Sequence, residues 1–335
     1  MINLAVFGAG RIGHVHAINA SGLGSVQINY LVDPIAGEHQ ALLAARIGAE
    51  SVSADTVFSD SSIDGVIIAS STDTHAELLL KAAESGKAIF CEKPVSLNFA
   101  TVETVTDVVE ASGVACLLGF QRRYDPDFRF VRDRVLSGDA GTLEHVVMHT
   151  RDPSPPSLAY ISHSGGMFRD QAIHDFDMAR YLLGEEIVTV YAVGNCLIDR
   201  EIGDAGDIDT AMVTLTSASG RFVQMINCRR APFGYDQRLE VLCSKEVLYV
   251  ENRPQRGVTI ADVSGFRASP PMSYFIERFA AAYRNEIVAF VDMIETGREP
   301  LAGIRDGLEA QRIAEAAIVS MQTGMPIHIG PDWRP

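Results

Sequence analysis

The sequence predicts an α/β chain of two domains, in which a doubly wound parallel sheet precedes a domain built on an antiparallel or mixed sheet. Its 335 residues exceed what one ordinary hydrophobic core accommodates. Over roughly the first 120 residues, short apolar runs alternate with stretches that carry apolar residues at helical spacing. Beyond Gly119, strand-like runs follow one another with short turns. We therefore expect a first domain over residues 1–120 and a second over residues 121–335, whose last helix or strand can pack back on the first.

The first domain shows the alternation that parallel sheets require. Strands buried on both faces form continuous apolar runs, and helices connect them. The apolar runs are Leu4–Phe7, Ile28–Val32, Gly65–Ala69, Ala88–Cys91 and Val114–Leu118. The amphipathic stretches between them are Ile12–Ser21, Gly37–Ile47, Thr74–Ser85 and Phe99–Ala111. This alternation predicts βαβ units in a doubly wound, nucleotide-binding type of sheet.

The second domain is expected to begin after a connecting helix, Tyr124–Leu136. Its strand-like segments are Leu143–Thr150, Ile187–Ile198, Asp209–Thr216, Arg221–Arg229, Arg238–Cys243 and Val247–Glu251. One helix, Phe168–Leu183, interrupts the series and ends at Gly184, a favourable helix stop. Two long helical stretches, Tyr274–Glu295 and Ile304–Met321, close the chain.

The composition argues against several classes of partner. The net charge of −15, from 43 acidic and 28 basic residues, repels phosphate backbones and anionic lipid, so we expect neither nucleic-acid nor membrane partners. The five cysteines are scattered without a CxxC, which fits a reducing compartment. With no secretory signal pattern at the start, the sequence predicts a cytoplasmic protein. The histidines are not paired with cysteine at metal-ligand spacing, and we expect no metal.

A glycine-rich turn marks the expected cofactor site. The chain leaves its first strand through Gly8, Gly10 and Gly13, a GxGxxG whose last residues, with Arg11 and Ile12, open a helix. The first glycine permits a tight turn, the second lets a pyrophosphate approach the backbone, and the third lets helix and strand pack closely. Asp33 ends the second strand, where a carboxylate accepts hydrogen bonds from an adenosine ribose diol and repels a 2′-phosphate. NAD is therefore predicted rather than NADP.

Two further strand ends are expected at the same edge of the sheet, because ligands of open parallel sheets bind outside the carboxyl ends of the strands. Ser71, Thr72 and His75 follow the apolar run Gly65–Ala69, and Glu92 and Lys93 follow the apolar run Ala88–Cys91. We count these five residues as cofactor-contacting candidates. The alternative interpretation of Ser71 and Thr72 is that their hydroxyl groups cap a helix, and that of Lys93 is an ordinary surface lysine.

These motifs together resemble the Gfo/Idh/MocA oxidoreductase family. They are the GxGxxG, the sequence EKP at Glu92–Pro94, and GGxxxDxxxHxxD over Gly165–Asp177. Further segments resemble the inositol dehydrogenases of that family, namely Ala88–Pro94, Gly119–Asp125, Arg151–Pro153, His174–Gly184 and Gly234–Arg238. The resemblance implies an N-terminal Rossmann domain, a C-terminal domain with a large open, mostly antiparallel sheet, and a homotetramer. It places the catalytic lysine, aspartate and histidine of the family on Lys93, Asp170 and His174.

The residues themselves support a proton-transfer site. Asp170, His174 and Asp177 are spaced by four and three, which puts them on one face of a helix. Oxidation of an alcohol removes a hydride and a proton, and a histidine can accept the proton near neutral pH. Asp170 would then orient the imidazole, and Lys93 would donate to the reacting oxygen. A purely structural network around His174 is the alternative interpretation.

A polyol has several hydroxyl groups and no charge, so its site needs dispersed hydrogen-bonding partners. Lys93, Asp170 and His174 are substrate candidates together with Arg122, Asp152, Asp177 and Tyr235. Arg122 is also a cofactor candidate, and Asp152 can simply form a turn with Pro153.

The expected function is therefore the NAD-dependent oxidation of a secondary hydroxyl of a cyclic polyol, with myo-inositol converted to 2-keto-myo-inositol (scyllo-inosose). Two alternatives stay open. The substrate can be another inositol isomer or an aldose sugar, because fold does not determine substrate. The chain can also be a non-catalytic dinucleotide sensor, which the presence of Lys93, Asp170 and His174 disfavours.

Overall fold

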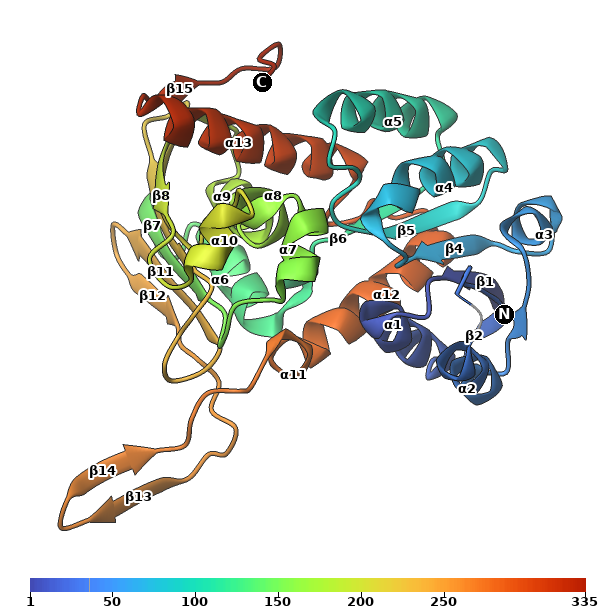
Figure 1. Ribbon diagram of the computed structural model, residues 1–335, viewed down its shortest axis with the longest axis horizontal. Coiled ribbons are helices and arrows are strands. Elements are labelled where there is room, and N and C mark those ends of the chain that lie inside the picture. Colours follow the sequence, from blue (N-terminus) through green and yellow to red (C-terminus); the bar gives the residue numbers. More distant parts are fainter. Residues whose placement is uncertain (36) are drawn as a thin grey trace. The chain divides into compact units, whose positions relative to one another are not determined.

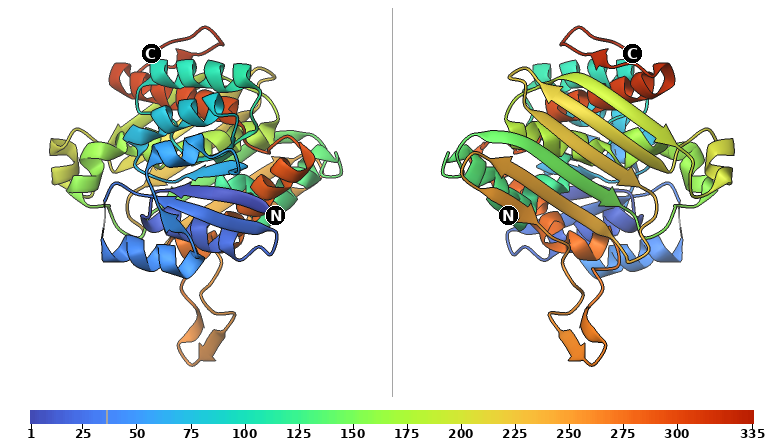
Figure 2. Two further views of the ribbon diagram at one scale, coloured as in Figure 1. Left: turned by 90° about the vertical axis from the view of Figure 1, so that its right-hand side faces the viewer. Right: turned by 90° about the vertical axis from the view of Figure 1, so that its left-hand side faces the viewer.

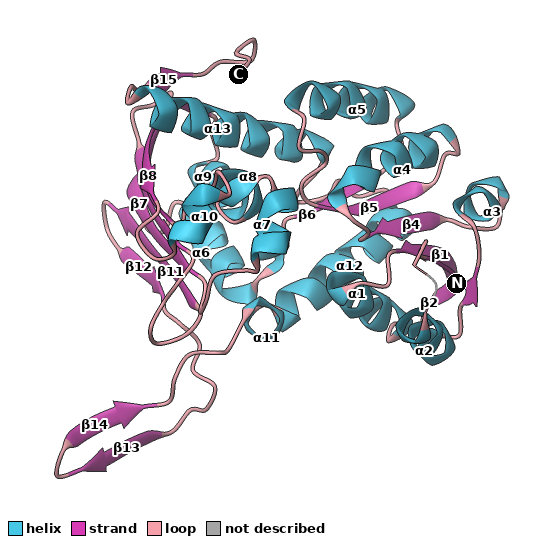
Figure 3. Cartoon of the chain, viewed as in Figure 1, coloured by secondary structure: helices cyan, strands magenta, loops and turns pink. Residues whose placement is uncertain are grey.

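The computed structural model describes residues 1–35 and 37–335, and these form two compact units. The first unit comprises residues 1–124 and 281–309, and the second comprises residues 125–280 and 310–335. The sequence placed the domain boundary after residue 120 and allowed the last helix or strand to pack back on the first domain. In the structure, the late segment that belongs to the first unit is residues 281–309. Figure 3 shows helices and strands alternating in the first unit, whereas strands follow one another in the second.

The first unit contains the parallel sheet expected from the sequence. Its strands lie in the order β3-β2-β1-β4-β5-β6, so the chain reverses its direction of progress between β1 and β4. All pairings are parallel. The strands are β1 (Ile2–Phe7), β2 (Val26–Val32), β3 (Glu50–Ser51), β4 (Gly65–Ile68), β5 (Ala88–Glu92) and β6 (Cys116–Gly119). This order is that of a doubly wound dinucleotide-binding fold, with its ligand crevice at the reversal.

Helices cover both faces of this sheet (Figure 1), α1, α2 and α12 on one face and α4 and α5 on the other. Their bounds, with the remaining short helices of this unit, are α1 (Arg11–Ser21), α2 (Glu38–Ile47), α3 (Ala54–Ser59), α4 (Thr72–Glu84), α5 (Phe99–Ser112), the 3-10 turn η1 (Gln121–Tyr124) and α12 (Ala280–Thr296). The helix α12 supplies Ile287 and Phe290 to the hydrophobic core, where Phe290 meets Phe90 edge to face at 5.9 Å. A Cβ atom at Gly65 would lie 3.1 Å from Phe290, so this close packing depends on a glycine in β4.

The second unit is built on a seven-stranded mixed sheet in the order β12-β11-β7-β10-β9-β8-β15. Only β7 and β10 pair in parallel, so the expected large, mostly antiparallel sheet is confirmed. The strands are β7 (Leu143–Arg151), β8 (Ile187–Asn195), β9 (Thr210–Ser217), β10 (Phe222–Cys228), β11 (Asp236–Cys243), β12 (Val247–Val250) and β15 (Ile327–His328). Figure 2 shows that helices lie behind one face and that the other face is bare within this unit.

The helices of the second unit differ from the expectation at one important place. The single helix predicted over Phe168–Leu183 is wrong, because the chain forms two helices, α8 (Gly166–Asp170) and α9 (Ile173–Leu183). The others are α6 (Pro126–Leu136), α7 (Leu158–Ser164), α10 (Arg200–Asp204) and α11 (Phe275–Arg278). The last long helix, α13 (Ile304–Thr323), begins in the first unit and ends in the second.

Some elements were not expected from the sequence. An exposed hairpin of β13 (Thr259–Asp262) and β14 (Gly265–Ala268) extends away from the seven-stranded sheet (Figure 1). The alternation of apolar and polar residues in this hairpin is too short, and its turn too polar, for the hairpin to be predicted from the sequence. Within residues 1–35 and 37–335, no helix is both long and apolar enough to cross a bilayer.

Candidate active site

The glycine-rich turn between β1 and α1 has the geometry that the sequence predicted. Gly8 has a φ of +99°, and a Cβ atom there would lie 2.5 Å from the carbonyl oxygen of Ala69. A Cβ atom at Gly13 would lie 2.1 Å from the carbonyl oxygen of Gly8. A Cβ atom at Gly10, by contrast, would meet nothing within 4 Å. Two glycines therefore close the turn, and the third leaves open space beside it.

This open space lies where a phosphate group would fit. Gly10 is the N-cap of α1, and Arg11 and Ile12 are its first residues. No side chain caps this helix terminus, so the amide groups of the first turn are not covered by a cap. Uncapped amides at a helix N-terminus attract anions. The residues present therefore fit the pyrophosphate of a dinucleotide.

Asp33 follows β2 and lies against the same turn. Its Oδ2 accepts a hydrogen bond from the amide of Ala9 at 2.6 Å, and its Oδ1 accepts one from the amide of Ile35 at 2.8 Å. These bonds fix the orientation of the carboxylate, and each oxygen keeps further acceptor capacity for a ribose diol. The structure thus holds Asp33 beside the turn, where its charge also opposes a 2′-phosphate.

The loop after β4 contains the next group of candidates. Ser71 is the N-cap of α4, Thr72 is its first residue, and neither supplies a side-chain cap bond. His75 is fully buried, with Nδ1 2.9 Å from the carbonyl oxygen of Pro94 and Nε2 3.1 Å from that of Ser70. Burial lowers the pKa of His75. The imidazole therefore links the loop after β4 to the loop after β5, and this linking role was not foreseen.

The loop after β5 and the turn after β6 complete the edge of the sheet. Lys93 is partly buried and follows Glu92, which is buried. Arg122 is buried within η1. Its neighbour Arg123 donates to the carbonyl oxygen of Leu301 and to Asp306, which anchors η1 inside the first unit. All these strands are parallel, so the residues that follow them lie at the same edge of the sheet, the edge formed by the carboxyl ends of the strands. These residues are Gly8, Ser71, Lys93 and Arg122.

Asp170 lies at the end of α8 in the second unit, not one helical turn before His174 on a common helix. Its Oδ1 accepts a hydrogen bond from the Tyr160 hydroxyl at 2.9 Å. On its other side, Arg229 Nη1 lies 3.9 Å from Oδ2. Arg229 is fully buried, and its Nη2 pairs with Asp207 at 2.7 Å. A hydroxyl and a guanidinium thus lie against the two oxygens of the Asp170 carboxylate and fix its position.

His174 is the second residue of α9, and the next residue anchors that helix to the sheet. Asp175 is fully buried; its Oδ1 accepts from the Thr150 hydroxyl on β7 at 2.8 Å and its Oδ2 from Asn227 on β10 at 2.6 Å. Asp175 was not predicted from the sequence to have a role. The available signal was an acidic residue among the apolar residues Ile173, Phe176 and Met178. Such a residue is expected to be buried, and a buried charge normally has a partner.

The remaining substrate candidates lie around the same helices or beside them. Gln171, in the break between α8 and α9, donates to Asp152 at 2.6 Å and to the carbonyl oxygen of Cys228 at 3.2 Å. Asp152 is therefore close to the Asp170–His174 segment. Asp177 is fully buried within α9. Tyr235 packs edge to face on Tyr274, with ring centroids 5.7 Å apart, so its ring belongs to an aromatic cluster.

The fold and the turn together define an NAD-binding oxidoreductase domain joined to a domain with a large open sheet. Residues 2–120 match the oxidoreductase family with an NAD-binding Rossmann fold, and residues 128–249 match the GFO/IDH/MocA C-terminal domain. The chain belongs to the Gfo/Idh/MocA oxidoreductase family. The predictions of this family, of an oxidoreductase and of NAD as its cofactor are confirmed.

Relatives extend over nearly the whole chain. Inositol 2-dehydrogenase of Rhizobium meliloti (strain 1021) is 42% identical over 98% of this chain and 99% of its own. The crystal structure of a myo-inositol dehydrogenase from Corynebacterium glutamicum is 38% identical, with a TM-score of 0.95 and 99% coverage of both chains. The structure of scyllo-inositol dehydrogenase from Lactobacillus casei, with bound NAD(H) and scyllo-inositol, is 25% identical with a TM-score of 0.89, covering 98% of this chain and 99% of its own.

Proposed function

We propose that this protein oxidises one secondary hydroxyl group of a cyclic polyol, converting myo-inositol to 2-keto-myo-inositol (scyllo-inosose). The observation that carries the proposal is the full-length similarity to inositol dehydrogenases, combined with the positions of Asp170 at the end of α8 and His174 at the start of α9. Substrate identity depends on the site rather than the fold, so the side chains must also account for the chemistry.

His174 is the proposed base. It takes the proton of the reacting hydroxyl, while the hydrogen on the same carbon leaves as hydride. Bound NAD supplies the hydride acceptor. Asp170 orients the imidazole and stabilises its charged form, and Tyr160 and Arg229 hold its two oxygens in place.

Lys93 has the second proposed catalytic role. Its ammonium group donates to the reacting oxygen and stabilises the negative charge that develops as the proton leaves. Arg122, Asp152, Asp177 and Tyr235 are proposed to bind the other hydroxyl groups. Gly8, Gly10, Arg11, Ile12, Gly13, Asp33, Ser71, Thr72 and Glu92 are proposed to form the dinucleotide site, with His75 supporting two of its loops.

A substrate panel tests the proposal. NADH absorbance is followed with purified protein and NAD⁺ across myo-inositol, scyllo-inositol, glucose, galactose and xylose. We expect the largest kcat/KM with myo-inositol. A larger value with scyllo-inositol would transfer the assignment to that isomer, for which the Lactobacillus casei structure is the precedent. Absence of turnover with every polyol and sugar would favour the dinucleotide sensor.

A further inference from the structure

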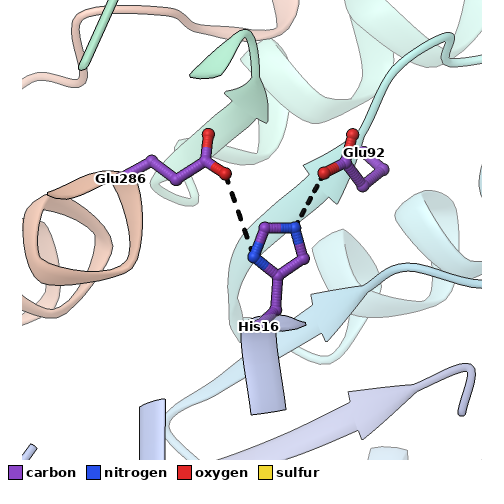
Figure 4. Close-up of side chains that lie close together, drawn as sticks. All are labelled: His16, Glu92 and Glu286. Carbon is purple, nitrogen blue, oxygen red and sulfur yellow. Dashed lines mark hydrogen bonds and ion pairs between the residues drawn. The ribbon is translucent and has the colours of Figure 1, made fainter. Parts of the chain in front are cut away.

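The first unit contains a buried cluster of ionisable side chains that the proposed reaction does not use directly. His16 on α1, Glu92 at the end of β5 and Glu286 on α12 meet in its interior (Figure 4). His16 and Glu286 are fully buried, and Glu92 is 8% exposed. We call these three residues the His16 cluster. It joins the helix that starts at the glycine-rich turn to the strand that precedes Lys93.

The imidazole lies between the two carboxyl groups. His16 Nε2 is 2.7 Å from Glu92 Oε1, which is a short hydrogen bond, and His16 Nδ1 is 3.8 Å from Glu286 Oε1. Neither carboxyl oxygen of Glu286 has a hydrogen-bonding partner, and neither does His16 Nδ1. The rings of Phe90 and Tyr283 pack against the imidazole, with centroids 4.7 and 5.8 Å away. Two buried polar groups thus face each other in an apolar enclosure.

The charge of the His16 cluster bears on the protonation state of its two carboxyl groups. Two ionised carboxylates beside one imidazole would leave at least one uncompensated negative charge in the interior, which costs several kcal/mol. Burial, followed by the negative charge of Glu92, raises the pKa of Glu286 well above its usual range. A neutral acid at Glu286 would remove the excess charge, and its carboxyl group faces His16 Nδ1 at 3.8 Å.

The neighbouring ionisable groups do not supply the missing positive charge. Arg123 on η1 pairs with Asp306 at 2.9 Å. Burial lowers the pKa of His75 on α4, and burial raises the pKa of Tyr124 on η1 and of the Cys91 thiol on β5, so all three are neutral near pH 7. Burial likewise raises the pKa of Cys116 on β6 to about 12.

A metal ion fits these positions less well than a proton. With Nε2 engaged by Glu92, only His16 Nδ1 and Glu286 face each other as ligands. Catalytic zinc sites have three protein ligands and structural zinc sites four. A proton on Glu286 removes the excess negative charge without further ligands.

We propose that Glu286 is protonated at neutral pH and that the His16 cluster, through the hydrogen bond between His16 and Glu92, positions the end of β5 and with it Lys93. The protonation of Glu286 does not depend on the proposed function. The effect on Lys93 rests on the proposed function, because it assumes that Lys93 acts in the reaction. His16 and Glu286 are accordingly positioning residues.

The protonation is tested by stability and infrared spectroscopy of Glu286→Gln. The unfolded chain releases the Glu286 proton above a pKa of about 4.3, whereas the native protein keeps it, so wild-type stability should fall as pH rises toward the native pKa. The amide of Glu286→Gln mimics the neutral acid and does not titrate. The Tm of wild type relative to Glu286→Gln should therefore decrease steadily between pH 5 and 8. The infrared band of a protonated carboxyl group at pH 7 should disappear in the variant.

Glu295→Gln is the matched control, because Glu295 is an exposed carboxylate on the same helix. Its Tm should follow that of wild type at every pH, and the infrared band of the protonated carboxyl group should remain. Equal pH dependence of wild type and Glu286→Gln would overturn the proposal. So would a divalent metal that copurifies with wild type and is lost in Glu286→Gln, since a cation would then occupy the place of the proton.

The positioning role is tested by His16→Asn. We expect kcat to fall about tenfold or more while the KM for the polyol changes little, because displacement of a catalytic group mainly slows the chemical step. The pH profile of kcat should also shift, which a general loss of stability would not cause. Glu295→Gln should keep wild-type kcat. An unchanged kcat and pH profile in folded His16→Asn would refute positioning. Wild-type protein without any turnover would refute the proposed function and leave the infrared result intact.

Discussion

Asp33 is the residue on which cofactor choice depends. Its carboxylate is fixed by the amides of Ala9 and Ile35, so it cannot easily turn away from a 2′-phosphate. We expect kcat/KM with NAD⁺ to exceed that with NADP⁺ by at least about tenfold, equivalent to about 1.4 kcal/mol. Asp33→Ser should narrow the ratio, and adding Pro34→Arg should narrow it further. Steady-state kinetics with both cofactors measure this, and equal activity of the wild type with the two would contradict it.

His174 and Lys93 carry the prediction about catalysis. His174→Ala and Lys93→Ala should each lower kcat by about 100-fold or more, because each removes a group that acts on the same oxygen. The double variant should lose little more than either single variant, since residues that act as a unit are not additive. Affinity for NAD⁺ should change little in His174→Ala, because the dinucleotide candidates lie on other elements.

The control for these variants is His163→Ala, an exposed histidine on α7 that should retain wild-type turnover. If His174→Ala keeps near-normal turnover with the best polyol, His174 is structural. Lys93 would then be the next candidate for the base.

At the scale of elements, α9 depends on a buried carboxylate for its attachment. Asp175→Ala removes the acceptor for Thr150 and Asn227 and leaves two buried donors without partners. Each orphaned group costs about 1–3 kcal/mol, so the free energy of unfolding should fall by several kcal/mol. Urea unfolding monitored by circular dichroism measures the change. Asp204→Ala, at an exposed position in α10, should shift the midpoint only slightly. A similar small shift in Asp175→Ala would show that the bonds to the sheet are dispensable.

Regular elements were predictable because their periodicity is local. The five main strands of the parallel sheet and the strands β7 to β12 lie close to the expected ranges, since burial on one or both faces imposes a pattern on neighbouring residues. The break at Gln171 and Ala172 was not predictable in this way. Apolar spacing continues across it, and the interruption arises from tertiary bonds, such as those from Gln171 to Asp152 and Cys228.

The candidate site was predictable only where a motif carried it. The glycine-rich turn, Asp33 and the EKP segment each have a local sequence signature. The His16 cluster has none, because Glu286 lies far from His16 and Glu92 in the sequence and meets them only through packing of α12 on the sheet. Tyr160 and Arg229 were missed for the same reason.

At the scale of the whole molecule, the bare face of the seven-stranded sheet predicts self-association. Exposed apolar side chains lie along four of its strands, β8, β9, β10 and β12, namely Tyr191, Val193, Met212, Phe222, Val247 and Tyr249. Monomers rarely expose an apolar patch of this extent. We expect a homotetramer at micromolar concentration, measured by light scattering.

Substitution of this face tests the assembly. Met212→Glu combined with Phe222→Glu should shift the mass toward smaller species, because the charges would be desolvated in the interface. Leu42→Glu, which changes an exposed apolar residue on α2, should leave the mass unchanged. A monomeric wild type would show that this face is solvated. Cytoplasmic location and the expected lack of metal, nucleic-acid and membrane partners stay predictions.

The return of α12 to the first unit has a consequence for the order of events during synthesis. Ile287 and Phe290 complete the core beneath β4 and β5, yet the ribosome must first translate residues 125–280. At bacterial or eukaryotic elongation rates this interval lasts roughly 8–30 s. During it, the nascent sheet exposes the apolar face that α12 will cover and holds Glu92 without its later neighbour. We therefore expect the nascent chain to bind chaperones during this window. A fragment of residues 1–124 should accordingly show weak protection in hydrogen exchange, and should gain protection when residues 281–309 are attached through a flexible linker.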